Sequence, residues 1–354
     1  MKRSIAYFIT AHGYGHAVRS SYLINQLGRE NQITIISGIP KQFFDEEITV
    51  PFTYIQAEFD TGCVQFDTFS IDIESTQQNY LEQAFKNDRT LADWVNKLRD
   101  LDCDCIVSDV VPFAGVIANE LNIPSISVSN FWWSDIYSAF PKSPDQEALL
   151  NRVNCEMNCF THHVVLNPPM RKWESTPNVL TDVNLIRIAR DRSNELREKL
   201  GIEQTQHLAL LYTGNYGMNS VKWEKLSQFD NWRFIGLHPI PGKPSNFTLI
   251  NKDQFTMQEF TASVDLVISK LGYGTVTESL ASGTPLLYTP REGFAESPVL
   301  EKFLLPYGHC HCIEETEFNE LKWESALDSL VSEGRRSFRL FNDTERVAKW
   351  ILSR

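Results

Sequence analysis

The sequence predicts an α/β protein built from two Rossmann-like domains. Its 354 residues exceed what one hydrophobic core ordinarily supports, and they suit two domains of about 150–200 residues each. Short apolar runs alternate with helical patterns along the chain, as in parallel sheets joined by helices. Each half also has a strand followed by a glycine-bearing turn, at residues 11–16 and 213–219. We expect an N-terminal domain over residues 1–190, a second domain over 191–335 and a C-terminal helix within 336–354.

The N-terminal half alternates buried strands with amphipathic helices. Short apolar runs are typical of parallel strands that are buried on both faces. The predicted strands are 4–10, 33–37, 52–55, 105–108, 125–128, 164–166 and 185–188. The predicted helices run through 20–27, 74–99, 114–121 and 145–163, where apolar residues recur at helical spacing.

The C-terminal half repeats this pattern after a charged linker at residues 190–195. Its predicted strands are 208–212, 232–236, 264–268, 285–288 and 307–313. Its predicted helices cover 196–200, 275–282, 315–332 and 338–352, and a further loop and helix lie at 255–260. The repeat of strand and helix predicts a second parallel sheet covered by helices.

The turn after the first strand, Ala11 to His16, contains two glycines and two histidines. A glycine pair alone would suit any tight first crossover in such a sheet. The two histidines favour a functional role for this turn, because imidazole ordinarily titrates near neutral pH and serves as a general base. Asp109 ends strand 105–108, where an acid equally suits a cap for the following helix. Both turns are expected to open on one edge of the sheet, where His16 and Asp109 can meet.

Two further segments combine polar and aromatic residues at expected strand ends. Asp60 lies in the irregular run 59–67, where turn capping and ligand contact are equal alternatives. Trp132 and Trp133 follow the strand 125–128 and can either stack on a sugar or form the buried start of a long helix. We expect burial for at least one of them.

Residues 264–297 have the order strand, glycine turn, helix, strand and acidic loop. Lys270 follows the first strand, and Gly272 and Gly274 are expected to take positive φ and to let a ligand approach the backbone. Free N–H groups at the helix start, the helix dipole and Lys270 together suit a phosphate. Glu278, one turn inside the helix, is expected to reach outward to a ribose diol.

Four segments of the chain resemble one protein family. The run SKLGYGTVTESLASGTPLLYTPREGFAES, residues 269–297, resembles the donor-binding segment of nucleotide-sugar-dependent glycosyltransferases with the B-type fold. The turn at 11–16 and the segments 60–72 and 108–137 are similar to other parts of that family. The resemblance is strongest to the glycosyltransferase-like N-terminal half of plant L-arabinokinases. It implies two Rossmann-like domains that face each other across a cleft, with a C-terminal helix that returns to the first domain.

In the N-terminal domain the resemblance implies a catalytic pair and an acceptor-binding wall. His16 takes the place of the base that faces the acceptor, and Asp109 takes the place of the acid that hydrogen-bonds this histidine. Whether His12 or His16 is the base stays open. The predicted acceptor-binding residues are His12, Tyr14, Asp60, Trp132 and Trp133.

In the C-terminal domain the resemblance implies a binding site for the sugar donor. Lys270 replaces the family's diphosphate-binding histidine, and Glu278 matches its ribose-binding glutamate. The acid and amide pair that holds the sugar hydroxyls falls on Glu296 and Ser297, so the amide is absent. The other predicted donor-binding residues are Gly214, Asn215, Gly272, Tyr273, Gly274 and Thr275. The implied donor is a nucleoside diphosphate sugar, UDP-linked, and no cofactor is expected.

The composition indicates which classes of partner and which cell compartment to expect. The net charge of −12 argues against DNA or RNA as a partner, because nucleic-acid binding needs a basic face. No apolar run approaches the roughly 18–20 residues of a membrane span, and no signal segment precedes the first strand, so we expect a cytoplasmic protein. The seven cysteines include no C-x-x-C pair, and reduced thiols are expected. The alternation in 309–312 would point His and Cys to opposite faces of a strand, so no metal site is expected.

These observations predict a metal-independent, inverting glycosyltransferase that moves a sugar to a hydroxyl of a small acceptor. Two alternatives stay open. One is a nucleotide-sugar-binding module without transfer activity, which would bind donor and yet turn over no acceptor. The other is a sugar-nucleotide 2-epimerase of the same architecture, which would form product from donor alone.

Overall fold

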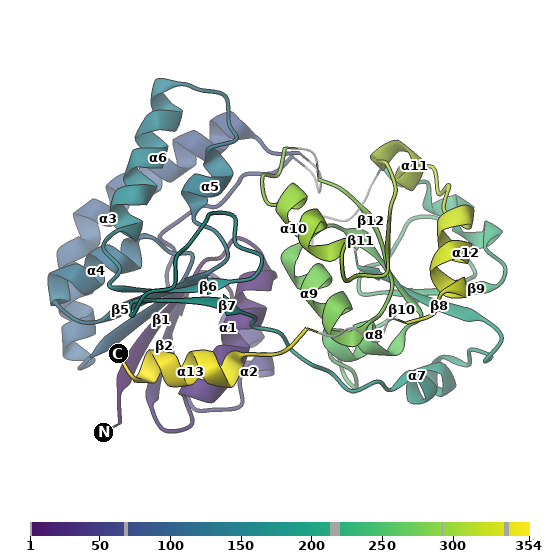
Figure 1. The fold of residues 1–354 in the computed structure, drawn as a ribbon, viewed down its shortest axis with the longest axis horizontal. Helices are drawn as coiled ribbons and strands as arrows, with labels where there is room; N and C mark the ends of the chain where they lie inside the picture. Colours follow the sequence, from purple (N-terminus) through teal and green to yellow (C-terminus); the bar gives the residue numbers. More distant parts are fainter. Residues whose placement is uncertain (1, 67–69, 213–219, 292, 336–339) are drawn as a thin grey trace. The chain divides into compact units, whose positions relative to one another are not determined.

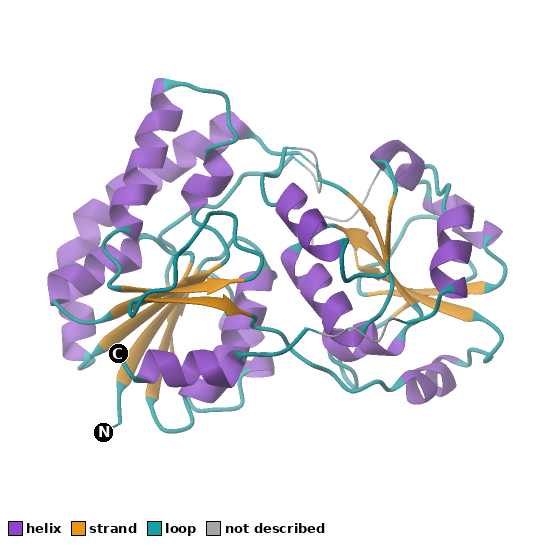
Figure 2. Ribbon diagram, in the orientation of Figure 1, coloured by secondary structure: helices purple, strands orange, loops and turns teal. Residues whose placement is uncertain are grey.

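The computed structural model describes residues 2–66, 70–212, 220–291, 293–335 and 340–354, which divide into two compact units. The N-terminal unit comprises Met1–Gln65, Ile71–Leu185 and Asn342–Arg354. The C-terminal unit comprises Phe66–Ser70 and Ile186–Phe341. In each unit, helices cover both faces of one sheet (Figures 1 and 2).

The N-terminal unit is built on a seven-stranded sheet with the order β3-β2-β1-β4-β5-β6-β7. Every pair of neighbouring strands in it is parallel. The strands are β1 (Ser4–Ile9), β2 (Gln32–Ser37), β3 (Thr53–Gln56), β4 (Cys105–Asp109), β5 (Ser125–Ser129), β6 (His162–Leu166) and β7 (Val179–Val183). The strand order reverses between β1 and β4, and such a switch point is where ligands bind in open α/β sheets.

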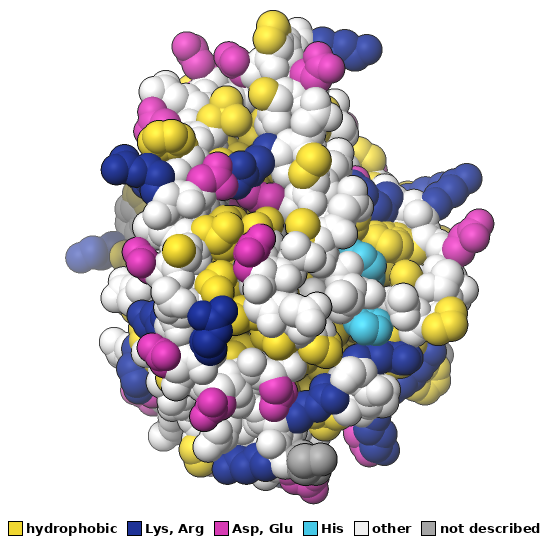
Figure 3. Space-filling model, turned by 90° about the vertical axis from the view of Figure 1, so that its left-hand side faces the viewer, with side chains coloured by type: hydrophobic (Ala, Val, Ile, Leu, Met, Phe, Trp, Pro, Cys, Tyr) yellow, Lys and Arg dark blue, Asp and Glu magenta, His cyan; other side chains and the backbone are white. Residues whose placement is uncertain are grey.

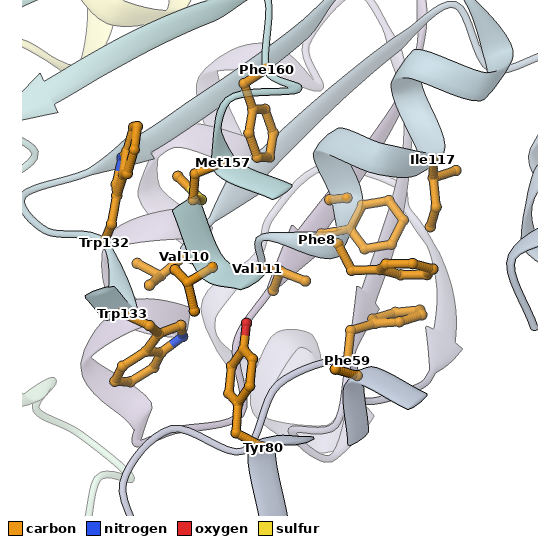
Figure 4. Packing of buried hydrophobic residues seen from close by; sticks show 14 of the residues in the cluster. Phe8, Phe59, Tyr80, Val110, Val111, Ile117, Trp132, Trp133, Met157 and Phe160 are labelled. Carbon is orange, nitrogen blue, oxygen red and sulfur yellow. The ribbon is translucent and has the colours of Figure 1, made fainter. Parts of the chain in front are cut away.

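The helices of this unit pack on the sheet in two layers. They are α1 (Tyr14–Leu27), α2 (Lys41–Glu47), α3 (Ile73–Asp100), α4 (Phe113–Leu121), α5 (Trp133–Tyr137), α6 (Pro144–Met157) and α13 (Thr344–Leu352). Because side chains alternate along a strand, Phe8 of β1 joins a core with α3, α4, α5 and α6, whereas Tyr7 joins a core with α1, α2 and α13. Figure 4 shows part of the first core. The last helix thus packs in the N-terminal unit, through Val347, Ala348 and Ile351.

The C-terminal unit has a six-stranded parallel sheet with the order β10-β9-β8-β11-β12-β13. The strands are β8 (His207–Tyr212), β9 (Trp232–Gly236), β10 (Phe247–Leu249), β11 (Leu266–Lys270), β12 (Leu286–Thr289) and β13 (Cys310–Cys312). The helices are α7 (Ser193–Leu200), η1 (Trp223–Gln228), α8 (Met257–Ser263), α9 (Tyr273–Ser282), α10 (Ser297–Leu304), α11 (Glu315–Asn319) and α12 (Glu324–Ser332). One core contains η1, α11 and α12, and the other contains α7, α8, α9 and α10.

Several local predictions were wrong. The strand expected at 185–188 is irregular, and β7 precedes it. Leu185 is buried in a core of the N-terminal unit and Ile186 in a core of the C-terminal unit, whereas Ile188 is exposed. The helix expected over 315–332 is two helices, since Leu321 between them has φ 54°, in the left-handed region. The strands β7 and β10 and the helix α2 were not predicted.

Candidate active site

The structure brings His16 and Asp109 into contact at the switch point of the N-terminal sheet. Asp109 is the last residue of β4 and lies beside Ile9, the last residue of β1, while His16 is in the first turn of α1. The distance from His16 Nδ1 to Asp109 Oδ1 is 2.9 Å. The carboxylate is fully buried, whereas the imidazole keeps 12% of its surface exposed. This contact is the one that the parallel strand order predicted.

Two residues that the sequence analysis missed complete the surroundings of Asp109. Arg19 donates from Nε to Oδ2 at 2.7 Å and from Nη2 to Oδ1 at 2.6 Å, and Ser20 Oγ donates to Oδ2 at 2.9 Å. Arg19 is itself only 4% exposed and also donates to Asn130 Oδ1 at 3.0 Å. Arg19 and Ser20 lie three and four residues after His16 on α1, so the three residues share one helix face. This spacing was the sequence feature that could have identified them.

Asp109 does not cap the following helix. The N-cap residue of α4 is Pro112, and no side chain makes a capping hydrogen bond there. Because the carboxylate is instead enclosed by Arg19, Ser20 and His16, the alternative of a purely local helix cap is ruled out.

The electrostatics keep Asp109 ionised. Burial alone would raise the pKa of its carboxyl, but the charge of Arg19 and the contact with His16 outweigh burial and hold that pKa well below its usual range. Two groups lie beside His16 Nδ1: the Asp109 carboxylate, which only accepts, at 2.9 Å, and Arg19 Nη2, which only donates, at 3.1 Å. The contact with Asp109 favours a proton on Nδ1, and in that tautomer the other ring nitrogen, Nε2, is the proton acceptor.

The backbone directly after Asp109 is strained. Val110 has φ 61°, which is rare for a β-branched residue, and its side chain is buried. Such strained positions cluster at functional sites, where the surrounding structure holds them in place. The turn therefore supports a functional assignment for Asp109.

Asp60 lies in the interior next to the first turn. It is 5% exposed, and Thr10 Oγ1 donates to its Oδ1 at 2.6 Å, while the same hydroxyl accepts from His12 N at 3.2 Å. Burial raises the pKa of Asp60 to about 7, with smaller contributions from neighbouring acids, although the bond from Thr10 opposes the shift. Its Oδ2 is buried and makes no hydrogen bond within the described chain.

The predicted acceptor-binding aromatics are not open surfaces. Trp133 is 1% exposed and stacks on Tyr137, with the ring of His12 against it in an edge contact. Trp132 is 6% exposed, and the guanidinium of Arg171 lies 3.9 Å from its ring centroid. Figure 4 shows the two indoles extending in opposite directions from the chain. The burial expected for at least one of the two rings holds for both, and both pack among neighbouring side chains.

The remaining residues of the first turn differ in their setting. Tyr14 is 40% exposed and its ring packs near that of Phe43, so it stays accessible to a ligand. His12 Nδ1 accepts a hydrogen bond from Cys63 N at 3.3 Å. Gly62 has φ 57°, and a Cβ there would lie 2.2 Å from the ring of His12. The ring of His12 is thus held by its neighbours, and His16 is the histidine paired with an acid.

In the C-terminal unit, Lys270 ends β11 just before α9 begins. It pairs in register with Thr289 of β12. Gly272, the N-cap, has φ −150°, and Gly274 also lacks a positive φ, so the predicted left-handed conformation was wrong. Of the described residues, none has an atom within 4 Å of a Cβ built at either glycine. The glycines therefore keep the start of the helix clear of side chains from that part of the chain.

The ammonium of Lys270 is largely buried and has no counter-ion in the described chain. Burial, and then the nearby charge of Arg291, lower its pKa to about 7. Among the residues that the structure describes, none forms a hydrogen bond or ion pair with Lys270 Nζ. A cation held in this way favours binding of an anion.

Glu278 does not reach outward as predicted. Its side chain is 8% exposed, Gln258 Nε2 donates to its Oε1 at 3.3 Å, and Arg187 Nη2 lies 3.8 Å from the same oxygen. The residue sits on the face of α9 that packs against α8, which explains the difference. Arg187 lies in the segment after β7 and had no signal in the sequence pattern.

The other predicted donor-binding residues lie at helix starts. Tyr273 is the first residue of α9, and the buried Thr275 has its Oγ1 3.5 Å from Ser269 Oγ. Glu296 is the N-cap of α10 and makes no capping hydrogen bond, while Ser297 Oγ accepts from Arg291 N at 3.2 Å. Gly214 and Asn215 lie outside the described residues.

The described part of the chain shows neither a metal-binding cluster nor a membrane-spanning helix. No group of three or more His, Cys, Asp or Glu side chains there has a metal-binding arrangement. No helix in those residues has the length and apolar character needed to span a bilayer. The face drawn in Figure 3 mixes basic and acidic side chains, without an extended basic patch.

Comparison with known proteins agrees with this architecture. Residues 3–163 match the family model described as glycosyl transferase family 1. The chain is 28% identical to L-arabinokinase of Arabidopsis thaliana over 344 residues, which are 92% of this chain and 32% of that protein. The chain thus spans about a third of the length of this curated relative.

Solved structures share the whole fold. The glycotransferase of kitacinnamycin is 16% identical with a TM-score of 0.65, covering 99% of this chain and 94% of that one. UGT89C1 of Arabidopsis thaliana, complexed with UDP, is 15% identical with a TM-score of 0.58, covering 100% and 99%. These findings confirm the predicted resemblance to B-type glycosyltransferases and the predicted fold, and they support glycosyltransferase as the enzyme class.

Proposed function

We propose that this chain, which has the B-type glycosyltransferase fold, is a metal-independent, inverting glycosyltransferase. It moves a sugar from a nucleoside diphosphate sugar, UDP-linked, to a hydroxyl of a small acceptor. The observation that carries this proposal is the contact of 2.9 Å between His16 Nδ1 and the buried carboxylate of Asp109 at the switch point of the sheet. The solved UGT89C1 structures with UDP and with quercetin support the two substrate classes by similarity of fold.

In the proposed reaction His16 is the general base. Its Nε2 takes the proton of the acceptor hydroxyl while the oxygen attacks the anomeric carbon and the bond to the diphosphate breaks. The imidazolium that forms is stabilised by Asp109, which stays ionised through its pair with Arg19. Direct displacement of this kind inverts the anomeric centre.

The C-terminal unit would bind the leaving diphosphate. Lys270 supplies a positive charge, and the N–H groups at the start of α9 lie beside Gly272 and Gly274, which carry no side chains. Negative charge grows on the diphosphate as the glycosidic bond breaks. A fixed cation there lowers the barrier without requiring a metal ion for this role.

Glu278 has a changed role in this proposal. Since its carboxylate contacts Gln258 and Arg187, we assign it to shaping the wall of the donor site, and direct contact with a ribose requires these partners to move. Glu296 remains a candidate for contact with the sugar hydroxyls, because it takes the place of the acid that holds them in the family and lies at the start of α10.

A second candidate function is a nucleotide-sugar-binding module without transfer activity. It is favoured by one observation: the chain corresponds to only 32% of L-arabinokinase. The two functions differ in turnover and share donor binding.

The test measures binding and turnover separately. Calorimetry with UDP and a panel of nucleoside diphosphates establishes whether a donor binds, and release of UDP from UDP-sugars is followed with and without an acceptor panel. Acceptor-dependent release that H16A abolishes supports the transferase. Tight donor binding without release, in wild type across the whole panel, favours the binding module.

A further inference from the structure

The loop between β3 and α3 packs against the turn from which His16 extends. Thr10 Oγ1 donates to Asp60 Oδ1 of this loop at 2.6 Å, and Cys63 N donates to His12 Nδ1 at 3.3 Å. The backbone at residue 62 comes so close that a Cβ there would lie 2.2 Å from the ring of His12. The loop thus contacts the turn at several successive positions.

The same loop is fixed from behind by two helices. Asn87 of α3 donates from Nδ2 to Phe59 O at 2.7 Å, and Tyr137 of α5 donates to Gly62 O at 2.9 Å. Asn87 is 3% exposed and Tyr137 is fully buried. Because a buried polar group that loses its hydrogen bond costs free energy, these bonds make the loop a fixed support for the turn.

Thr10 joins the loop to both parts of the proposed catalytic pair. A hydroxyl has a single hydrogen to donate, and Thr10 gives it to Asp60. Its oxygen therefore accepts the bond from His12 N, at 3.2 Å, in the turn that leads to His16. The backbone N of Thr10 donates to Asp109 O at 3.2 Å. One buried residue thus bonds to the loop, to the turn and to the strand end that carries Asp109.

We propose that Asp60 is a positioning residue for the general base and that it acts through Thr10. The proposal rests on the proposed function, in which His16 takes the proton of the acceptor. A displacement of about 1 Å from the productive geometry can cost about 10²-fold in rate. In this role Asp60 touches no reacting atom, which differs from the direct contact with the acceptor that the sequence analysis expected.

The first measurement is acceptor-dependent UDP release by variants of the full chain, analysed as kcat and as the KM of the acceptor. We expect D60A and T10V to lower kcat by about 10- to 100-fold and to change the acceptor KM by less than about threefold. D60N keeps an oxygen that accepts from Thr10, so its kcat should stay within about threefold of wild type. A raised acceptor KM with an unchanged kcat in D60A would mean that Asp60 binds the acceptor directly, and it would overturn the proposal.

A double-mutant cycle tests whether Asp60 acts through Thr10. Both single changes break the same chain of hydrogen bonds. The kcat of D60A/T10V should therefore lie within about twofold of the lower single variant. Losses that multiply would mean that the two residues act independently, which contradicts the proposal.

T161V is the matched control for T10V. Thr161 Oγ1 also donates and accepts, because it donates to Ser125 O and accepts from Ser125 N, both at 2.9 Å. Thr161 directly precedes β6, at the edge of the sheet opposite Asp109, so T161V should leave kcat unchanged. Thermal unfolding is measured for each variant. Equal losses of kcat in T161V and T10V would assign the effect to general stability and overturn the proposal.

Nitrogen NMR of the histidine rings tests the positions without turnover. The ring nitrogen shifts of His16, assigned with H16Q, report its tautomer and hydrogen bonds. They should move in D60A and T10V and stay in place in D60N and T161V. If wild type shows no acceptor-dependent turnover, the proposed function fails, and the ring shifts still test the positioning. Unchanged His16 shifts in D60A and T10V would overturn this inference alone.

Discussion

Arg19 and Asp109 form a two-pronged ion pair inside the N-terminal unit, directly beside His16. Nε donates to Oδ2 at 2.7 Å and Nη2 donates to Oδ1 at 2.6 Å. Neither side chain is more than 4% exposed, so water does not screen the pair. The arrangement keeps a carboxylate ionised in a buried position, where it can hold the imidazole in one tautomer.

Replacing Arg19 should destabilise the fold and change the site together. R19Q leaves a buried carboxylate without its counter-ion, and such losses cost about 3–5 kcal/mol. Urea denaturation measures the loss. The control is K41Q, which breaks the exposed pair of Lys41 with Asp45 and should cost less than about 1 kcal/mol. A stability of R19Q equal to that of K41Q would contradict the buried ion pair.

The histidine and its acid should act on turnover and leave donor binding intact. H16A removes the proposed base and should lower turnover by about 10²–10⁴-fold. D109N keeps the shape of the side chain and removes its charge, so it should also lower turnover. UDP release reports turnover, and calorimetry with UDP reports binding. H311A, which changes an exposed residue of β13, is the matched control. Full turnover in H16A would contradict the assignment of His16 as the general base and would favour His12 in that role.

The sequence predicted those parts of the fold that depend on local patterns. The run at 105–108 was predicted to be a buried strand because it is short and mostly apolar. The structure has β4 there. The three-residue strand β10 was missed because two of its residues are exposed and carry no period. The false strand at 185–188 arose because Leu185 and Ile186 are buried in two different cores, and two adjacent buried residues give the same short apolar run as a strand.

The same distinction applies to the sites. His16 and Asp109 could be paired in advance because parallel strands end at one edge of the sheet. Arg19 was missed because a buried arginine and an exposed one cannot be told apart by the apolar spacing of a helix. The inward setting of Glu278 depends on how α9 packs on α8 and on Arg187, which no local pattern records.

Donor binding should take up a proton at pH 8. Burial and Arg291 lower the pKa of Lys270 to about 7, so the amine is mostly neutral at pH 8 in the free protein. A bound diphosphate favours the ammonium and raises its pKa, and the protein then takes a proton from the buffer. Calorimetry of UDP binding in two buffers with different ionisation enthalpies measures this uptake.

The charge-fixed variant tests the same point. K270R carries a guanidinium that does not titrate in this range, so its binding enthalpy should not depend on the buffer. Uptake in wild type should also shrink at pH 6, where Lys270 is already charged. A binding enthalpy of wild type that is the same in both buffers at pH 8 would contradict a neutral Lys270.

Asp60 should make the stability of the N-terminal unit fall as the pH rises from about 4 to about 7. Burial raises the folded-state pKa to about 7, above the ordinary value, so the folded protein binds a proton that the unfolded chain has already released in this range. The stabilisation is complete below the unfolded pKa and is lost as the pH rises through the folded one, at no more than about 1.4 kcal/mol per pH unit. Asp109 acts in the opposite direction and only at lower pH, because its pKa is lowered.

D60N isolates this contribution. The amide still accepts from Thr10 Oγ1 and places an N–H donor where Asp60 Oδ2 has no hydrogen bond, so packing is retained while the titration is removed. Urea denaturation of both proteins between pH 5 and pH 8 gives the difference in their free energies of unfolding. That difference should shift in favour of D60N as the pH rises, because only the wild type must ionise a buried carboxyl. If the free energies of unfolding of wild type and D60N changed with pH in parallel, Asp60 would be ionised throughout this range. That result would contradict the neutral carboxyl inferred from its burial.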